Sequence, residues 1–280
     1  MNWIILSVLA GLFFALSRVI ARTVLKKQSD PLAYTAIHDF VAGLVLLPLL
    51  LFGFHLPEKG ITWVFFGLIV VFAFLCDWLT FLALKKIDIS VYKVVIQIRH
   101  VLVLFGGFLF FSEALTLWKS IAVVLIISGV FIAAYKKQRF SWSGGVVLAM
   151  LSTFLAVIAF MFVKVVITDF SETALASLEL MTIGLLAFSF LGFNVKKIKK
   201  EMKLNAKGII LSGFLFGIFE VLLFSALKIG DISKVIPVTQ VSLVFAVLMG
   251  IFFLKERERV PQKLAGMVVI IIGIILMNFV

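Results

Sequence analysis

Long apolar runs dominate this sequence and leave few folds open to it. Each run is close to the roughly 20 residues that an α-helix needs to cross a bilayer, and the connections are short. Only helices and closed barrels satisfy their backbone hydrogen bonds in lipid, and these runs are too long and too uniformly apolar for barrel strands. We therefore expect ten membrane-spanning helices, at residues 2–21, 32–53, 61–84, 89–111, 117–135, 142–165, 173–193, 207–227, 232–254 and 262–279.

The composition agrees with an integral membrane protein. Of the 280 residues, 63% are hydrophobic and 14% are charged, against about half and about one quarter in soluble domains. Cys76 is the one cysteine, so no disulfide forms within a monomer, and no Cys/His spacing of a metal site occurs. The first apolar run has no basic residue before it, which argues against a cleaved signal peptide. We expect neither a metal nor another cofactor.

Basic residues are distributed unevenly among the connections. Eighteen lysines and arginines lie in the odd-numbered loops, and five lie on the even-numbered side when nearby helix ends are included. The positive-inside rule therefore predicts cytoplasmic odd loops and both termini outside, in a multi-pass protein of the plasma or inner membrane. This topology also accounts for the net charge of +12. The lysine-rich run at 196–203 has a second interpretation, a patch for lipid or nucleic acid, although we expect no nucleic-acid partner.

The chain repeats one phrase about half its length apart. Residues 81–90 read FLALKKIDIS, and residues 224–233 read FSALKIGDIS, at an offset of 143. Residues 29–40 align in the same way with residues 170–181, at an offset of 141. The pairs that match at the offset of 143 are Asp77 with Glu220, Asp88 with Asp231, Ser90 with Ser233, Gln97 with Gln240, Gly107 with Gly250 and Glu113 with Glu256.

An odd number of spans in each copy forces the two copies to cross the membrane in opposite senses. Two halves related by a pseudo-dyad in the membrane plane can exchange conformations, so that a central polar cavity opens first to one side and then to the other. We therefore expect a transporter that works by alternating access. The alternative is that the duplication only provides a convenient scaffold.

This pattern resembles the EamA family of ten-helix transporters in the drug/metabolite transporter superfamily, over essentially the whole chain. The residues that carry the resemblance are the ALKKIDIS and ALKIGDIS turns, Gly107 and Gly250, the endings FFSEALTLW and FFLKERERVPQKLAG, and the final GIILMNF. The resemblance implies an all-α fold of two five-helix repeats, which we place at residues 1–140 and 141–280. It also implies a cavity lined by helices one to four and six to nine, and small polar metabolites or drugs as solutes.

Ionisable side chains inside the predicted spans are costly unless they are paired or face a cavity. Most lie about 5–12 Å from the cytoplasmic end of a span, whereas Glu179 and Glu220 lie about 10–12 Å from the outer end. We predict that Arg18, Asp39, Asp77 and Lys93 form a charge network at the cytoplasmic gate; direct solute binding is the alternative. The candidates for gating or coupling are Arg18, His38, Asp39, Asp77, Glu179 and Glu220.

Energy coupling has two candidate modes, proton coupling and solute exchange. Asp77 and Glu220 occupy equivalent places in the two repeats, and buried carboxylates can bind and release protons. We predict that one of them, or His38 or His100, exchanges protons during the cycle.

Solute sites in inverted repeats usually lie near the membrane midplane, where the fourth and ninth spans hold polar residues. Lys93, Gln97 and His100 follow the i, i+4, i+7 spacing of one helix face. We expect an anionic or zwitterionic solute, or an amine, with any acidic group toward Arg99. For Arg99 the alternative is a structural partner of a carboxylate, and for Trp78 it is lipid-facing packing. The predicted substrate-binding residues are Trp78, Lys93, Gln97, Arg99, His100 and Gln240.

Other classes of function agree less well with the sequence. A membrane-embedded transferase needs a carboxylate cluster for metal and phosphate, or a nucleophile with its base. The chain has no DxxxD, HExxH, P-loop or GxSxG motif, so we expect no enzyme activity. A channel and a flippase for a lipid-linked solute are the alternatives within the membrane class. We leave open whether the protein is a monomer or a homodimer.

Overall fold

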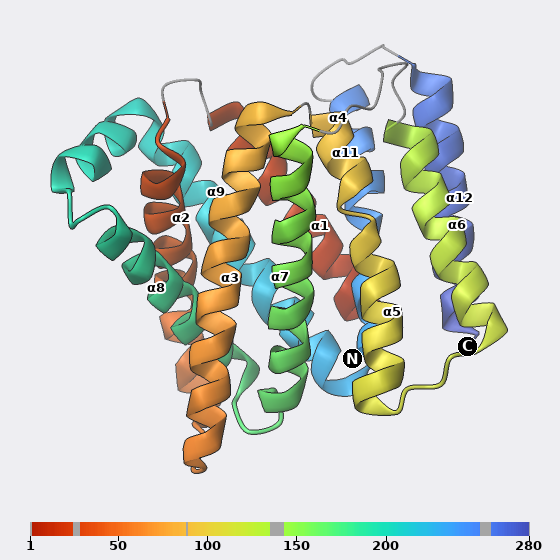
Figure 1. Ribbon diagram of the computed structural model, residues 1–280, viewed down its shortest axis with the longest axis horizontal. Helices are drawn as coiled ribbons and strands as arrows, with labels where there is room; N and C mark the ends of the chain where they lie inside the picture. Colours follow the sequence, from red (N-terminus) through yellow and green to blue (C-terminus); the bar gives the residue numbers. More distant parts are fainter. Residues whose placement is uncertain (1, 25–28, 88, 135–142, 253–258, 280) are drawn as a thin grey trace.

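The computed structural model describes residues 2–24, 29–87, 89–134, 143–252 and 259–279, and every regular element within them is helical. Both termini lie toward the same end of the helical bundle (Figure 1). The helices are α1 (Trp3–Val24), α2 (Pro31–Leu46), the 3₁₀ helix η1 (Leu47–Phe52), α3 (Gly60–Lys86), α4 (Ile89–Val95), α5 (Ile98–Phe111), α6 (Leu117–Ala134), α7 (Gly144–Val166), α8 (Glu172–Phe190), α9 (Val195–Ile229), α10 (Ile232–Val238), α11 (Val241–Phe252) and α12 (Val260–Asn278).

The apolar runs of the sequence form helices, as predicted. Eight helical segments of the described chain are long and apolar enough to cross a bilayer, and two shorter apolar helices occupy the fourth and fifth predicted runs. The prediction of an all-α, multi-pass membrane protein is therefore confirmed. The number of ten spans stays a prediction.

The fourth and ninth predicted runs differ from the expectation, because each is broken into two helices. At these breaks, backbone N–H groups donate to the carbonyl three residues back, as Gln97 does to Val94 at 3.2 Å and Gln240 does to Pro237 at 3.0 Å. Such bonds tighten the turn and interrupt the regular α-helical ladder. The two breaks lie at equivalent places of the sequence repeat, with Gln97 and Gln240 in the turns.

The helix α9 begins earlier than the sequence suggested. The run 196–203, which we predicted as part of a loop, belongs to this 35-residue helix. Lysine, glutamate and methionine are good helix formers, and Asn194 caps the helix by accepting the N–H of Lys197 at 3.2 Å. Figure 1 shows the first turns of α9 lying at an angle to the rest of the helix, across one end of the bundle.

The closest helix pairs each join one helix of the first half of the chain to one helix of the second half. The helix α1 packs along α9, α3 along α7, α2 along α8, and α6 along α12. The sequence repeat relates α1 to α7, α2 to α8, α3 to α9 and α6 to α12, so exchanging the halves maps each of these contacts onto another of the same set. The helix α1 starts toward the end of the bundle where N lies, and α7 starts at the opposite end (Figure 1). The two halves are therefore interlocked and run in opposite senses.

The helices α6 and α12 form a pair at one edge of the molecule (Figure 1). Their backbones approach closely at Gly129 and Gly266, where a Cβ on either residue would collide with the carbonyl oxygen of the other. Small residues allow such close contacts between helices in lipid.

Candidate functional site

Four acidic side chains from four helices come together inside the bundle. Asp39 of α2, Glu179 of α8 and Glu220 of α9 are buried, with exposed fractions of 2%, 4% and 7%, and Asp77 of α3 is half-buried. Each of the four acts electrostatically on the others. We call them the carboxylate cluster. Their positions along the spans had suggested two groups, one toward each side of the membrane, and the structure brings them into one site.

Close helix packing allows these acids to converge. At Gly184 of α8, a Cβ would collide with the backbone nitrogen of Phe40 in α2, and at Gly213 of α9 it would collide with the carbonyl oxygen of His38. Glycine at both positions lets α8 and α9 approach α2 at this level. The helix α2 therefore lies between them, with His38 and Asp39 at the contact.

Arg18 of α1 lies beside the carboxylate cluster and acts electrostatically on Asp77 and Glu220. Its guanidinium lies over the rings of Phe14 and Phe216, at 5.0 and 4.9 Å from the ring centroids. Aromatic faces attract a cation in this geometry. Among the described residues, Arg18 forms no ion pair within the 4.0 Å limit for a salt bridge. The rings thus hold this cation near the acids without a close pair.

His38 and Asp39 are neighbours both in sequence and in space. The Asp39 carboxylate accepts a hydrogen bond from His38 Nδ1 at 2.6 Å, and the ring of Tyr34 stacks on the ring of His38 at 5.4 Å between centroids. The Tyr34 hydroxyl lies 3.1 Å from Ser212 Oγ of α9. The pair is therefore held in place from two sides, while His38 Nε2 and Asp39 Oδ2 have no hydrogen-bond partner within the described residues.

Further unpaired polar atoms belong to the predicted site residues. Glu179 Oε2, Arg99 Nε and both ring nitrogens of His100 are buried and, in the part of the chain that the structure describes, make no hydrogen bond. In most proteins nearly all buried polar atoms are hydrogen-bonded to protein or to ordered water. A group of unsatisfied atoms inside a membrane protein therefore marks a place for water, an ion or a solute.

Three of the predicted binding residues lie at or just after the break between α4 and α5, with Gln97 in the turn and Arg99 and His100 in the first turn of α5. Gln97 and His100 are buried, and Arg99 is half-buried. Arg99 acts electrostatically on Tyr92 and on Arg18. Arg18 in turn acts on Asp77 and Glu220, so Arg99 is coupled to the carboxylate cluster through Arg18.

The remaining predicted binding residues have other surroundings. Trp78 packs beside Phe74 and Phe190, with ring centroids 6.1 and 6.2 Å away; its role in solute binding and the alternative of lipid-facing packing both stay predictions. Gln240 is half-buried in the break between α10 and α11. The side chain of Lys93 lies outside the described residues.

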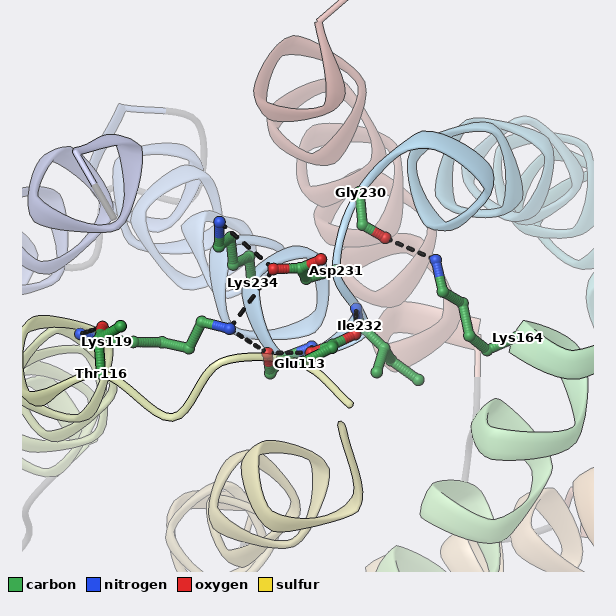
Figure 2. A network of polar contacts seen from close by, with 9 residues as sticks. Glu113, Thr116, Lys119, Lys164, Gly230, Asp231, Ile232 and Lys234 are labelled. Carbon is green, nitrogen blue, oxygen red and sulfur yellow. Dashed lines mark hydrogen bonds and ion pairs between the residues drawn. The ribbon is translucent and has the colours of Figure 1, made fainter. Parts of the chain in front are cut away.

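A second buried polar group involves residues to which the sequence assigned no chemical role. Glu113, between α5 and α6, accepts the backbone N–H groups of Ile232 and Ser233 at 2.7 and 3.1 Å, and also the Ser233 hydroxyl. Lys119 donates to Ser233 Oγ at 2.9 Å and to Asp231 at 3.4 Å (Figure 2). We call Glu113, Lys119, Asp231 and Ser233 the Glu113 clamp. It joins the two halves of the chain.

The clamp caps α10 from the other half of the molecule. Asp231 stands at the N-cap position of α10 but makes no side-chain cap hydrogen bond, so the Glu113 carboxylate satisfies the first amides instead. Ser112 ends α5 in the left-handed conformation, with φ of 54°, and so turns the chain toward Glu113. A Cβ at Gly107 would collide with the Glu113 carboxylate. Glycine at 107 therefore leaves the space that the clamp needs.

The turn between α9 and α10 is also held from α7. Lys164 donates to the carbonyl oxygens of Leu227 and Gly230, the latter at 2.8 Å (Figure 2). A cation at the carboxyl end of a helix satisfies its last carbonyls and favours its dipole. The sequence held a partial signal for this region, since Glu113, Asp231 and Ser233 each match a residue of the same type in the other half.

Comparison with known proteins agrees with this architecture. The model of the EamA-like transporter family matches the chain twice, over residues 1–135 and 143–279. One crystal structure of a protein is similar over 99% of this chain and 98% of the other, with a TM-score of 0.75 and 16% sequence identity, which shows a shared fold alone. An uncharacterized protein of Methanocaldococcus jannaschii is 42% identical over 69 residues, 25% of this chain and 50% of that relative. The match thus spans half the length of the relative.

Proposed function

Because the chain belongs to the EamA-like transporter family, we propose that it is a secondary transporter for a small zwitterionic or amine metabolite. The observation that carries this proposal is the carboxylate cluster, a group of enclosed acids beside Arg18 with unsatisfied polar atoms around it. Unpaired buried atoms cost stability in the empty protein. A solute with matching donors and acceptors satisfies them.

The balance of charge favours a solute that carries an ammonium group. The carboxylate cluster holds four acids, and the guanidinium group of Arg18 acts electrostatically on Asp77 and Glu220. The site therefore has room for positive charge, from a solute or from protons. Arg99 lies in the first turn of α5, where the helix dipole favours an anion. A zwitterion would place its ammonium at the carboxylate cluster and its carboxylate toward Arg99.

Alternating access is the mechanism that we propose for this site. Asp77, Tyr92 and Arg99 keep accessible surface although helices of both halves pack around α3 and α5, which supports a polar cavity between the halves. The interlocked halves that run in opposite senses support an exchange of conformations around it. In this proposal the chain crosses the membrane ten times, helices one to four and six to nine line the cavity, and both termini are outside. Asp77 or Glu220 carries the proton if transport is proton-coupled.

A ligand screen on the purified protein tests this proposal. Thermal unfolding is followed in detergent with amino acids, amines, nucleotides and sugar phosphates. We expect stabilisation by a zwitterion or an amine that is lost in Glu220→Gln and, for a zwitterion, also in Arg99→Ala. Lys59→Ala, which removes an exposed cation, serves as the control and should keep the response. Stabilisation by anions alone, unaffected by Glu220→Gln, would contradict the proposal.

Transport itself is measured in proteoliposomes with the solute found by the screen. Uptake with and without a proton gradient separates proton coupling from exchange. Gradient-independent uptake that is unchanged in Asp77→Asn and Glu220→Gln would remove these two carboxylates as proton carriers.

A further inference from the structure

The first turns of α9 carry a dense group of positive charge on one face. At about 100° of rotation per residue, five of the exposed lysines fall within an arc of about 100° around the helix axis. These residues are Lys196, Lys199, Lys200, Lys203 and Lys207, and we call them the lysine face. Glu201, the one acid between residues 195 and 207, is buried with an exposed fraction of 2%. The lysine face therefore has no acid of its own.

The remaining residues of this segment fix it to the bundle. Glu201 accepts the backbone N–H of Asp30 at 3.1 Å, and Lys197 pairs with the Asp30 carboxylate at 3.0 Å. Ile198 and Met202 pack against buried apolar residues of α1, α2 and α3. These contacts decide which side of the helix faces the bundle, so the fold itself turns the lysine face outward.

The lysine face continues into an apolar surface along the same helix. At the next positions with helical spacing, Ile210, Leu211 and Phe214 are exposed by 43%, 49% and 41%. They belong to the segment Ala206–Ile229, which is long and apolar enough to cross a bilayer, so their exposed surface faces lipid. Long lysine side chains next to such a surface reach the headgroup region. The lysines therefore stand where the hydrocarbon region ends.

We propose that the lysine face binds the headgroups of anionic phospholipids in the leaflet that adjoins this end of the bundle. The lysines supply the charge, and Ile210, Leu211 and Phe214 supply apolar surface for the acyl chains of the same lipids. Nucleic acid would be attracted by the charge alone, and the apolar continuation favours a lipid. Each lysine near an anionic membrane surface strengthens binding by about fivefold.

Lipid binding to the purified chain tests this inference. Native mass spectrometry follows a titration with phosphatidylglycerol in detergent, with phosphatidylcholine as the neutral reference. Lys200→Gln/Lys203→Gln should weaken the binding of phosphatidylglycerol by roughly 20-fold, and Lys200→Arg/Lys203→Arg should restore it. The matched control, Lys59→Gln/Lys86→Gln, removes two exposed lysines elsewhere and should change binding by less than about twofold.

Two results would overturn the proposal. The first is an equal loss of binding in the control variant, because the attraction would then depend on total charge and not on this face. The second is a single-stranded RNA that binds through Lys200 and Lys203 while phosphatidylglycerol does not. Thermal unfolding in phosphatidylcholine checks that both variants are folded, and Lys196→Gln/Lys199→Gln on the same face repeats the measurement if the first pair reduces folding.

Discussion

Glu113 and Glu179 are both buried glutamates, with exposed fractions of 8% and 4%, but their surroundings differ. Glu113 accepts two backbone N–H groups and a hydroxyl, and the buried ammonium of Lys119 binds the same serine. Glu179 lies among other carboxylates, and one of its oxygens has no hydrogen-bond partner in the described structure.

This difference in hydrogen bonding distinguishes buried charges that stabilise the fold from buried charges that are available to bind a solute or a proton. In the Glu113 clamp, each polar group replaces the water that its partner lost on burial, so removing one of them leaves the others unsatisfied. In the carboxylate cluster, some polar atoms are already unsatisfied, so removing a charge there relieves a cost as well as losing a contact. We therefore expect changes in the clamp to act on folding and changes in the cluster to act on transport.

The largest expected effect on stability is that of Glu113→Gln. Both Glu113 oxygens accept hydrogen bonds from Ile232 and Ser233, and the amide replaces one of these acceptors by an N–H group that faces a donor. It also removes the negative charge from the buried carboxylate that the N–H groups satisfy. We expect the free energy of unfolding to fall by about 3 kcal/mol, measured by denaturant unfolding in detergent. Glu58→Gln, at an exposed glutamate, should change it by less than about 0.5 kcal/mol. Equal stability of the two variants would show that the clamp contributes little.

A somewhat smaller loss is expected from Gly107→Ala. The added Cβ would collide with the Glu113 carboxylate and lie 3.3 Å from Ser233 Cβ, so the clamp must shift. Overpacking of this kind costs about 1–3 kcal/mol. Gly67→Ala in α3 is the matched control, since nothing lies within 4 Å of its added Cβ, and it should cause no loss. If Gly107→Ala is as stable as the unmodified protein, the segment between α5 and α6 that carries Glu113 must be able to move without cost.

Glu179→Gln makes the same chemical change in the other region and sharpens the comparison directly. We expect its free energy of unfolding to stay within about 1 kcal/mol of the unmodified protein, because no paired partner is lost. Uptake of the solute in proteoliposomes should fall by about tenfold or more, which corresponds to an increase of about 1.4 kcal/mol in the activation free energy of transport. A loss of stability as large as that of Glu113→Gln, with uptake unchanged, would reverse the roles of the two regions.

The smallest expected effect concerns the exposed ion pair between Asp30 and Lys197. Burial raises the pKa of Asp30, but Lys197 and the N–H groups of Leu32 and Ala33 outweigh it and lower this pKa below its usual value of 3.8. A lowered pKa in the folded state adds stability above the unfolded pKa, and this contribution disappears as the pH falls through the folded pKa. Because the pair is largely solvated, we expect less than about 1 kcal/mol at pH 7.

Thermal unfolding of the unmodified protein and of Asp30→Asn measures this contribution, since asparagine keeps the cap of α2 and removes the charge. The two melting temperatures should differ slightly at pH 7 and converge below pH 3.8. A difference that grows on acidification would mean that another group is responsible.

The helices of this protein are predictable from the sequence because their causes are local. The length of an apolar run decides whether a segment crosses a membrane, and the repeated phrases are visible without any structure. The start of α9 is less predictable, because a lysine-rich run such as 196–203 is also typical of a cytoplasmic loop. The good helix propensity of these lysines and the buried contact of Glu201 with Asp30 extend the helix instead.

The sequence was enough to identify which residues of the spans are candidates for the site. It was not enough to predict which of them lie close together in space. Depth along each span placed Asp77 and Glu220 on different sides of the membrane, because it ignores how far neighbouring helices shift and tilt. The approach of α8 and α9 to α2 at Gly184 and Gly213 is what brings the carboxylates together. The surroundings of Trp78 likewise depend on Phe190, which comes from another helix.

By itself, the sequence determined that this chain is a duplicated helical membrane protein, because apolar length is a property of neighbouring residues and the repetition can be read directly from the residue order. Only the tertiary structure decided which buried charges are paired. Glu113 reaches an amide 119 residues farther along the chain, while Glu179 meets other acids from three separate helices. Hydrogen bonding and electrostatics act over a few ångströms in space, and distance along the sequence does not contain that information.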